Sequence, residues 1–128
     1  MSTEDNKKIV LEFEEVAFNQ KDVEKAAKYL ADNYTQHNPN FADGIEGFKG
    51  GLQWLAGQYP LLKVEVKQIF ADKDYVIIHV YGETDATNPN GEKVAIVDIF
   101  RVKNGKIVEH WDVLQPIPAE SKNSNGMF

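Results

Sequence analysis

The spacing of apolar residues changes along the chain, and this change constrains the fold more than any other feature. Up to residue 58 apolar residues recur at helical intervals, whereas beyond residue 63 they recur as in strands. The first part predicts helices over 3–19, 22–30 and 45–58. The second part predicts four strands, one that begins at Val64 and others over 75–84, 93–102 and 106–114. Helices followed by antiparallel strands predict an α+β fold.

Length and composition predict one domain and exclude several classes of function. The 128 residues fit a single domain, 1–128, whose Pro-, Ser-, Asn- and Gly-rich end, 117–128, is expected to be loose. The net charge of -6 argues against a nucleic-acid partner. No apolar run approaches the ~20 residues that span a membrane, and the polar N-terminus is unlike a secretion signal. We therefore expect a cytoplasmic protein. Without cysteine, disulfides and thiolate chemistry are excluded.

Polar residues interrupt the last two predicted strands. The stretch IVDIFRVKNGKIVEHWDVLQP, residues 96–116, contains Asp98, Arg101, His110 and Asp112. Side chains alternate between the two faces of a strand, so Asp98 and Phe100 share one face and Arg101 takes the other. The pairing of the hairpin decides which residues of the last strand join Asp98.

The turn at Lys103-Asn104-Gly105 leaves two registers open. A two-residue Asn-Gly turn pairs Asp98 with Trp111. A three-residue turn, with its glycine in the left-handed conformation as a bulge, pairs Asp98 with His110 and brings Asp112 to the same face. Asn-Gly by itself favours the first register. A slip of one residue moves every side chain of the strand to the opposite face.

Two stretches, YTQHNPNFADGIEGF at 34–48 and DIFRVKNGKIVEHWDVLQP at 98–116, follow two N-terminal helices in the same order as in known proteins. With them, residues 5–118 resemble the SnoaL-like branch of the nuclear transport factor 2-like superfamily. The resemblance implies a cone-shaped barrel, in which a strongly curved mixed β-sheet wraps around N-terminal helices and leaves an internal pocket. Members include polyketide cyclases, ketosteroid isomerase, scytalone dehydratase and proteins without catalysis.

The ketosteroid isomerase branch has a similar Asp-x-x-Arg strand, whose Asp points into the pocket and donates a hydrogen bond to the substrate oxyanion. This motif matches Asp98, so the resemblance favours the three-residue turn and places Asp98 and His110 in the pocket. The catalytic base of that enzyme, an Asp before Pro, matches Asn38, which cannot accept a proton at neutral pH. Its oxyanion-binding Tyr has no counterpart in Phe13-Glu14-Glu15. The proton shuttle of the isomerase is therefore missing.

Asp98 and His110 are the expected acid–base pair, because His titrates near neutral pH and a carboxylate can orient its ring. The resemblance adds His37 as a third catalytic candidate, and we expect His37 and Asn38 to polarise or orient a carbonyl group. The expected substrate-binding residues are Asn38, His79, Trp54, Phe100 and Asp112. The sequence leaves a purely structural role open for each of these residues. The acids could face solvent, His37 could form a hydrogen bond in a turn, and the aromatic residues and His79 could pack in the core.

The outer face of the sheet carries a different prediction. Arg101 and Glu109 are expected to form a surface cross-strand pair. Trp111 would leave apolar area exposed beside them, which suggests a homodimer through the outer sheet face. The three histidines have no spacing typical of metal ligands, and no phosphate-binding loop is present. We therefore expect no metal and no cofactor.

These residues predict a cofactor-independent enzyme of the SnoaL-like type, a lyase or isomerase. It would do acid–base chemistry next to the carbonyl group of a small hydrophobic molecule, in an aldol cyclisation, isomerisation or dehydration. The alternative is a non-catalytic module of the same fold, for ligand binding or dimerisation. The missing isomerase base favours this alternative.

Overall fold

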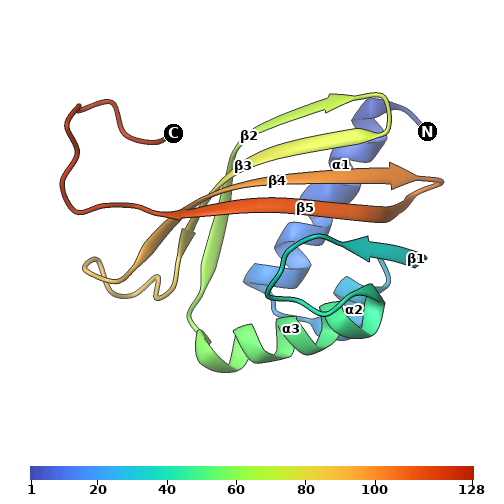
Figure 1. Cartoon of the computed structure of the whole chain (residues 1–128), viewed down its shortest axis with the longest axis horizontal. Coiled ribbons are helices and arrows are strands. Elements are labelled where there is room, and N and C mark those ends of the chain that lie inside the picture. Colours follow the sequence, from blue (N-terminus) through green and yellow to red (C-terminus); the bar gives the residue numbers. More distant parts are fainter.

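A five-stranded mixed sheet forms the body of the protein, in the order β1-β5-β4-β3-β2. In the computed structural model, which describes residues 1–128, the elements are α1 (Thr3–Glu14), the π-helical turn η1 (Glu15–Asn19), α2 (Val23–Ala27), β1 (Leu30–Gln36), α3 (Gly44–Gln58), β2 (Lys63–Asp72), β3 (Tyr75–Glu83), β4 (Lys93–Lys103) and β5 (Lys106–Pro116). β1 lies parallel to β5, and the other neighbours are antiparallel. The sheet curves around α1, and α3 lies beside its open side (Figure 1). The predicted α+β fold with a curved mixed sheet is confirmed.

The first predicted helix, 3–19, is one helix in two forms. The α-helix begins after Ser2, whose hydroxyl accepts a hydrogen bond from the backbone of Asp5 in a capping box, and it ends at Glu14. The wider η1 turn then continues to Asn19. Asp22 caps α2 as expected, although α2 is shorter than predicted. No helix of the protein is long and apolar enough to cross a membrane.

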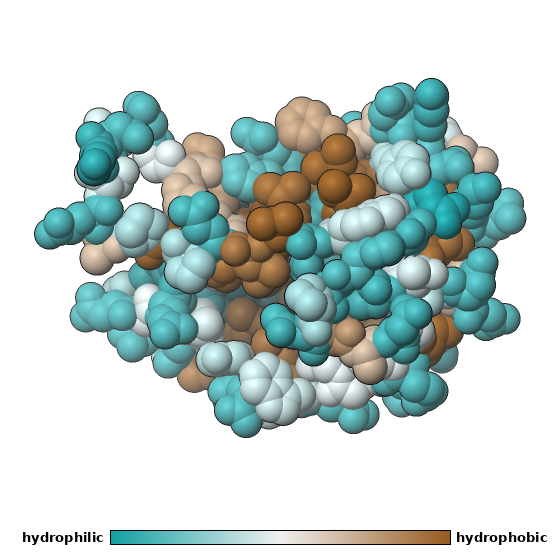
Figure 2. All heavy atoms as spheres, in the orientation of Figure 1, coloured by the Kyte–Doolittle hydropathy of each residue, from teal (hydrophilic) through white to brown (hydrophobic).

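Side chains of β3 alternate between core and surface. Val76, Ile78 and Val80 are fully buried against the helices, whereas Tyr75 and Ile77 are exposed on the outer face. One face of β3 is therefore buried, and the other lies at the surface. Figure 2 shows apolar side chains gathered over the outer face of the strands, and the exposed apolar residues there include Tyr75, Ile77, Val97 and Val113. A homodimer through this face stays a prediction.

The β4–β5 hairpin corrects the predicted turn. Asn104 and Gly105 both have positive φ, 52° and 78°, and Lys103 pairs with Lys106, so the turn has two residues. The extra residue lies beyond the turn, where pairing passes from Val102–Ile107 to Arg101–Glu109. Val108 is therefore the bulge residue.

The bulge at Val108 decides which side chains enter the cone. Asp98 pairs with Asp112 and Phe100 with His110, rather than Asp98 with His110 as predicted. The observed register differs by two residues from the predicted one, and a shift of two preserves the face. Asp98, His110 and Asp112 therefore share the inner face even though the predicted turn was wrong. Arg101 and Glu109 form the expected outer pair, with 2.9 Å between Nη2 and Oε1.

Two glycines bring the loop before α3 into direct contact with that helix. A Cβ on Gly47 would lie 1.9 Å from the carbonyl oxygen of Ala42, and one on Gly51 would lie 2.3 Å from the ring of Phe41. By contrast, a Cβ on Gly50 would meet no atom within 4 Å. A glycine inside a helix either weakens the helix or permits the close approach of a neighbouring segment. Gly47 and Gly51 permit close approach.

Candidate active site

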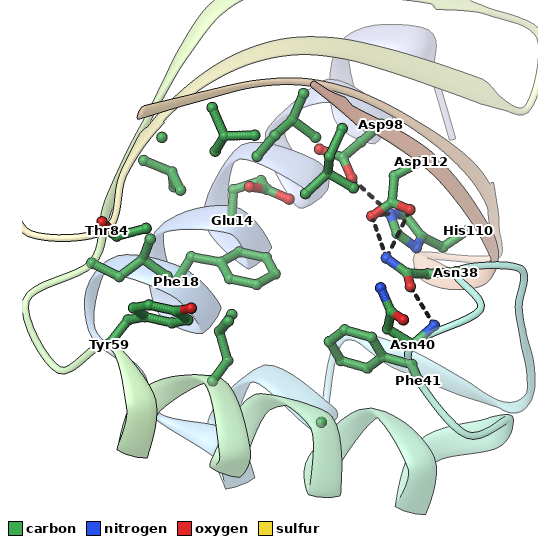
Figure 3. A pocket seen from close by; sticks show the side chains of 18 of the residues that line it. Glu14, Phe18, Asn38, Asn40, Phe41, Tyr59, Thr84, Asp98, His110 and Asp112 are labelled. Atoms are coloured by element: carbon green, nitrogen blue, oxygen red, sulfur yellow. Dashed lines mark hydrogen bonds and ion pairs between the residues drawn. The ribbon is translucent and has the colours of Figure 1, made fainter. Parts of the chain in front are cut away.

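A cavity of about 600 Å³ lies between the inner face of the sheet, α1 and α3. About half of the residues that line it, 14 of 27, are hydrophobic, and most of the surface of its wall is apolar, so most of a bound molecule would face apolar atoms. A group of polar side chains lies at one end, the polar end, where β4, β5 and the loop after β1 meet, whereas Thr84 and Tyr59 lie at the opposite end (Figure 3). This end contains Asp98, His110, Asp112 and Asn38.

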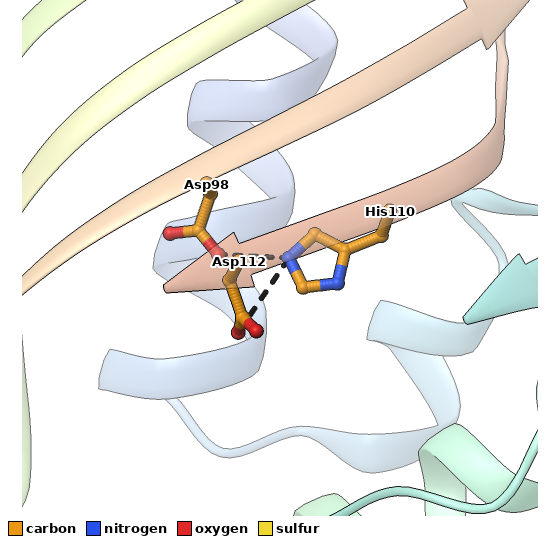
Figure 4. Close-up of side chains that lie close together, drawn as sticks. All are labelled: Asp98, His110 and Asp112. Carbon is orange, nitrogen blue, oxygen red and sulfur yellow. Dashed lines mark hydrogen bonds and ion pairs between the residues drawn. The ribbon is translucent and has the colours of Figure 1, made fainter. Parts of the chain in front are cut away.

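Asp98 and His110 form a buried hydrogen-bonded pair. Their relative exposures are 6% and 9%, and 2.7 Å separates Asp98 Oδ1 from His110 Nε2 (Figure 4). Burial raises the pKa of Asp98, while the hydrogen bond and charge of His110 act against this rise. Because burial prevails, the neutral form of Asp98 is favoured relative to a carboxyl in water. Phe100 packs against the imidazole ring, with 4.8 Å between ring centroids.

Gln36 determines which protons this pair carries. Its Oε1 accepts hydrogen bonds from the backbone N–H groups of His37 and Asn38, which identifies that atom as the oxygen. His110 Nδ1 lies 2.7 Å from the same oxygen, so Nδ1 must carry a proton and donate it. One further proton is then shared between His110 Nε2 and Asp98 Oδ1. The pair is either neutral Asp98 with neutral His110, or carboxylate with imidazolium.

Asn38 holds Asp112 beside this pair. Asn38 Nδ2 donates to both oxygens of Asp112, at 2.9 and 3.0 Å, while Asn38 Oδ1 accepts from the backbone N–H of Asn40. Asp112 Oδ2 lies 3.9 Å from His110 Nε2. The two oxygens of one carboxylate lie too close together to take separate protons of the same NH2 group, so one N–H of Asn38 is shared between them. This geometry indicates that Asn38 orients Asp112, and the contact of Asn38 with a ligand carbonyl stays a prediction.

Glu14 is a further acid in the wall of the cavity. Its side chain is 4% exposed, and it extends from the last turn of α1 toward the polar end (Figure 3). Burial raises the pKa of Glu14 well above its usual range, and the charges of Asp98 and Asp112 raise it further. Glu14 is therefore neutral over a wider range of pH than an exposed glutamate.

Asp98, His110 and Asp112 are also the group that could hold a metal ion, because their ligand atoms lie within 4.8 Å of one another. In the present geometry these atoms bind one another or Asn38. A bound ion would have to replace those hydrogen bonds, so the residues fit the pair described above better than a metal centre.

A family model for the SnoaL-like domain matches residues 10–110. The chain belongs to this SnoaL-like family. The match covers most of the chain, including β1, α3, β3, β4 and the part of β5 that carries His110.

Solved structures share the fold of this SnoaL-like domain. AclR from Streptomyces galilaeus, a proposed hydroxylase, is 24% identical over 89% of this chain and 91% of its own, with a TM-score of 0.74. A proposed polyketide cyclase from Acidithiobacillus ferrooxidans is 20% identical over 89% and 91%, with a TM-score of 0.76. Bal32a from a soil-derived mobile gene cassette is 18% identical over 88% and 90%, with a TM-score of 0.73. No curated protein matches the sequence significantly. At these identities the likeness shows the fold alone.

The SnoaL-like structure places two predicted histidines outside the cavity. His37 turns to the outer face, where its Nε2 lies 2.7 Å from Glu109 Oε2 and its ring stacks on Trp111 at 4.8 Å. His79 also lies on the outer face, 4.8 Å from the ring of Phe128. Neither residue lines the cavity. These positions correct the prediction that His37 and His79 contact a ligand in the cavity. Adjacent residues of an extended segment point to opposite sides, so each histidine faces outward while its neighbours face inward.

The predicted aromatic residues divide in a similar way. Trp54 lines the cavity but is 61% exposed, which places it at the rim. Phe100 belongs to the buried core and supports His110 instead of contacting the cavity, which corrects its predicted role as a binding residue. Asn38 and Asp112 line the cavity, but what they bind there stays a prediction.

Sequence reasoning missed Glu14 and Gln36. Glu14 lies on the apolar stripe of α1, between the buried residues Val10 and Ala17, and an acid on such a stripe is a usable signal. Gln36 carries no comparable signal, because its part depends on the pairing of β1 with β5, where it lies opposite His110.

The raised pKa of Glu14 predicts how stability depends on pH. The unfolded chain ionises Glu14 at its usual pKa, whereas the folded chain keeps the proton longer, so Glu14 destabilises the fold as pH rises through this interval. Glu14→Gln removes the ionisation. We expect its gain in unfolding free energy to be larger at pH 8 than at pH 5, because burial penalises only the ionised form of Glu14. Urea unfolding at both pH values measures the difference, and an equal effect at both would contradict the buried position.

Proposed function

We propose that this SnoaL-like protein catalyses cofactor-independent proton transfer at the carbon next to a carbonyl group of a small, mostly apolar molecule. The observation that supports the proposal is the buried Asp98–His110 pair with one shared proton, at the polar end of an apolar cavity. The name of the similar structure from Acidithiobacillus ferrooxidans as a proposed polyketide cyclase is consistent with chemistry of this type. Cyclisation by aldol addition, isomerisation and dehydration all begin with this proton transfer.

The geometry offers a route for the proton. Asp98 Oδ1 is bound to His110, whereas Oδ2 has no protein partner and points away from the ring (Figure 4). The substrate C–H bond breaks, its proton goes to Oδ2, and its electron pair moves into the carbonyl group to form an enolate. The proton on Oδ1 passes to His110 Nε2. The pair then carries one positive charge, which balances the negative charge of the enolate.

Asp112 and Gln36 support the charged state of His110. The imidazolium ring would donate from Nδ1 to Gln36 Oε1, and its Nε2 lies near the carboxylate of Asp112. A nearby negative charge favours the protonated form of histidine. Asn38, through the N–H group that the two oxygens of Asp112 share, keeps Asp112 in place for this purpose. We assign Asp112 and Asn38 as positioning residues.

Deuterium exchange of 2-tetralone tests the proposal. This bicyclic ketone has acidic protons next to its carbonyl group and is small relative to the cavity. We expect the protein to accelerate exchange of these protons in D2O, followed by 1H NMR, above the rate in buffer. His79→Gln is the control, because His79 lies outside the cavity, and it should exchange the ketone as fast as the unmodified protein. Binding without accelerated exchange would contradict the proposal and favour the ligand-binding alternative.

A further inference from the structure

Glu14 is the one acid of the polar end without a hydrogen-bond partner in the protein. Asp98 is bound to His110 and Asp112 to Asn38, whereas no side chain or backbone group binds the carboxyl group of Glu14. Every fully enclosed side-chain nitrogen or oxygen atom in the protein has a partner. The unpaired oxygens of Glu14 must therefore border the cavity, in agreement with its place in the cavity wall.

The charges around Glu14 favour its neutral form. Asp98 and Asp112 face it from β4 and β5, and His110 is held between those two acids. No lysine or arginine lies at this end, since the one such residue of the cavity wall, Lys93, donates to the carbonyl oxygen of Pro89. A neutral carboxyl group carries one O–H donor. That donor can be used only by a group inside the cavity.

We infer that Glu14 donates a hydrogen bond to the oxygen atom of the ligand, and that the cavity is built for an uncharged ketone or aldehyde rather than a carboxylate or phosphate. This inference rests on the proposed function and adds to it a donor on α1, across from the Asp98–His110 pair. As the proton leaves the carbon atom, negative charge develops on the ligand oxygen. A hydrogen bond to that oxygen strengthens as the charge grows, which lowers the barrier.

The same arrangement disfavours anionic ligands. A carboxylate in this part of the cavity would lie near the carboxylate of Asp112, and no lysine or arginine at this end would balance the two charges. Like charges in a buried site repel strongly, because little water screens them. 2-Tetralone and 2-naphthoate have similar bicyclic frames but differ in charge, so they separate a preference for neutral carbonyl compounds from general apolar binding.

The test uses Glu14→Gln and Glu14→Leu, with Glu12→Gln as a matched control on the exposed side of α1. The probe is 2-tetralone labelled with 13C at its carbonyl carbon, because a hydrogen bond to the oxygen moves this resonance downfield. We expect the bound resonance in the unmodified protein and in Glu12→Gln to lie downfield of that in Glu14→Leu, with Glu14→Gln between them. We also expect 2-naphthoate to bind at least tenfold more weakly than 2-tetralone. A second readout, the 13C resonance of the Glu14 carboxyl carbon in glutamate-labelled protein, should show the protonated form at pH 7.

The carbonyl shift and the exchange rate together separate this inference from the proposed function. Equal carbonyl shifts in the unmodified protein and Glu14→Leu, or an ionised Glu14 at pH 7, would overturn the inference even if the protein exchanges the ketone protons. Tighter binding of 2-naphthoate than of 2-tetralone would overturn it as well, as would failure of 2-tetralone to bind. A Glu14-dependent carbonyl shift without proton exchange would uphold the donor and refute the chemistry.

Discussion

Replacing Asp98 by Asn is expected to lower the rate of 2-tetralone exchange by roughly 10²–10⁴-fold, the usual contribution of a positioned acid or base. The amide keeps the shape of the side chain but cannot take a proton at neutral pH. Binding should change far less than the rate, because Asp98 forms a small part of the cavity wall. The measurement compares the exchange rate at saturating ketone with the dissociation constant from NMR titration.

His110→Gln tests the second member of the pair. A glutamine at this position can still donate to Gln36 or Asp98 but cannot accept the proton that leaves Oδ1, so exchange should fall by a similar factor. Asp72→Asn provides the matched control for charge, since Asp72 lies at the exposed end of β2. If exchange survives in both Asp98→Asn and His110→Gln, the assignment of this pair is wrong, whatever the activity of the unmodified protein.

Gly47→Ala should destabilise the fold by about 2 kcal/mol or more, within the range measured for strained or overpacked substitutions. Its Cβ would lie 1.9 Å from the carbonyl oxygen of Ala42, and this neighbour is backbone that cannot rotate away. The loop from Asn38 to Asp43 would have to move. Because Asn38 lies in this loop and holds Asp112, ketone exchange should fall as well. Urea unfolding and the exchange assay measure the two effects.

Gly50→Ala is the matched control on the same helix. It faces open space, so the substitution should stabilise the protein by up to ~1 kcal/mol through helix propensity alone. We expect the change in unfolding free energy to have opposite signs for Gly47→Ala and Gly50→Ala. Equal effects would mean that the loop does not pack on α3 as the structure places it.

The β4–β5 hairpin shows where reasoning from sequence succeeds and where it stops. The Asn-Gly pair predicts a two-residue turn, and the structure has one. Yet the two-residue turn alone would have turned Asp98 and His110 to opposite faces. The bulge at Val108 returns Asp98 and His110 to the same face, and no residue type in this stretch predicts the bulge. Val108 and its neighbour Ile107 are buried, so packing of the strand against the rest of the fold selects the bulge.

The segment from His37 to Asn40 shows a second limit. The resemblance to SnoaL-like sequences made both His37 and Asn38 candidates for contact with a ligand. Only one of two neighbours on an extended segment can face inward. The pairing of β1 with β5 decides the choice, since Glu109 and Trp111 hold His37 on the outer face.

Periodicity and residue type, which are properties of the chain, determined the three helical regions, the four later strands and the α+β class. The resemblance to SnoaL-like sequences added the curved sheet and the candidacy of Asp98, His110, Asn38 and Asp112. Tertiary structure alone decided that Asp98 meets His110 through Nε2, that Gln36 sets the tautomer, and that Glu14 faces the cavity. These contacts join residues up to 74 positions apart. Local preferences carry no information about such contacts, whereas register, bulge and helix packing determine them.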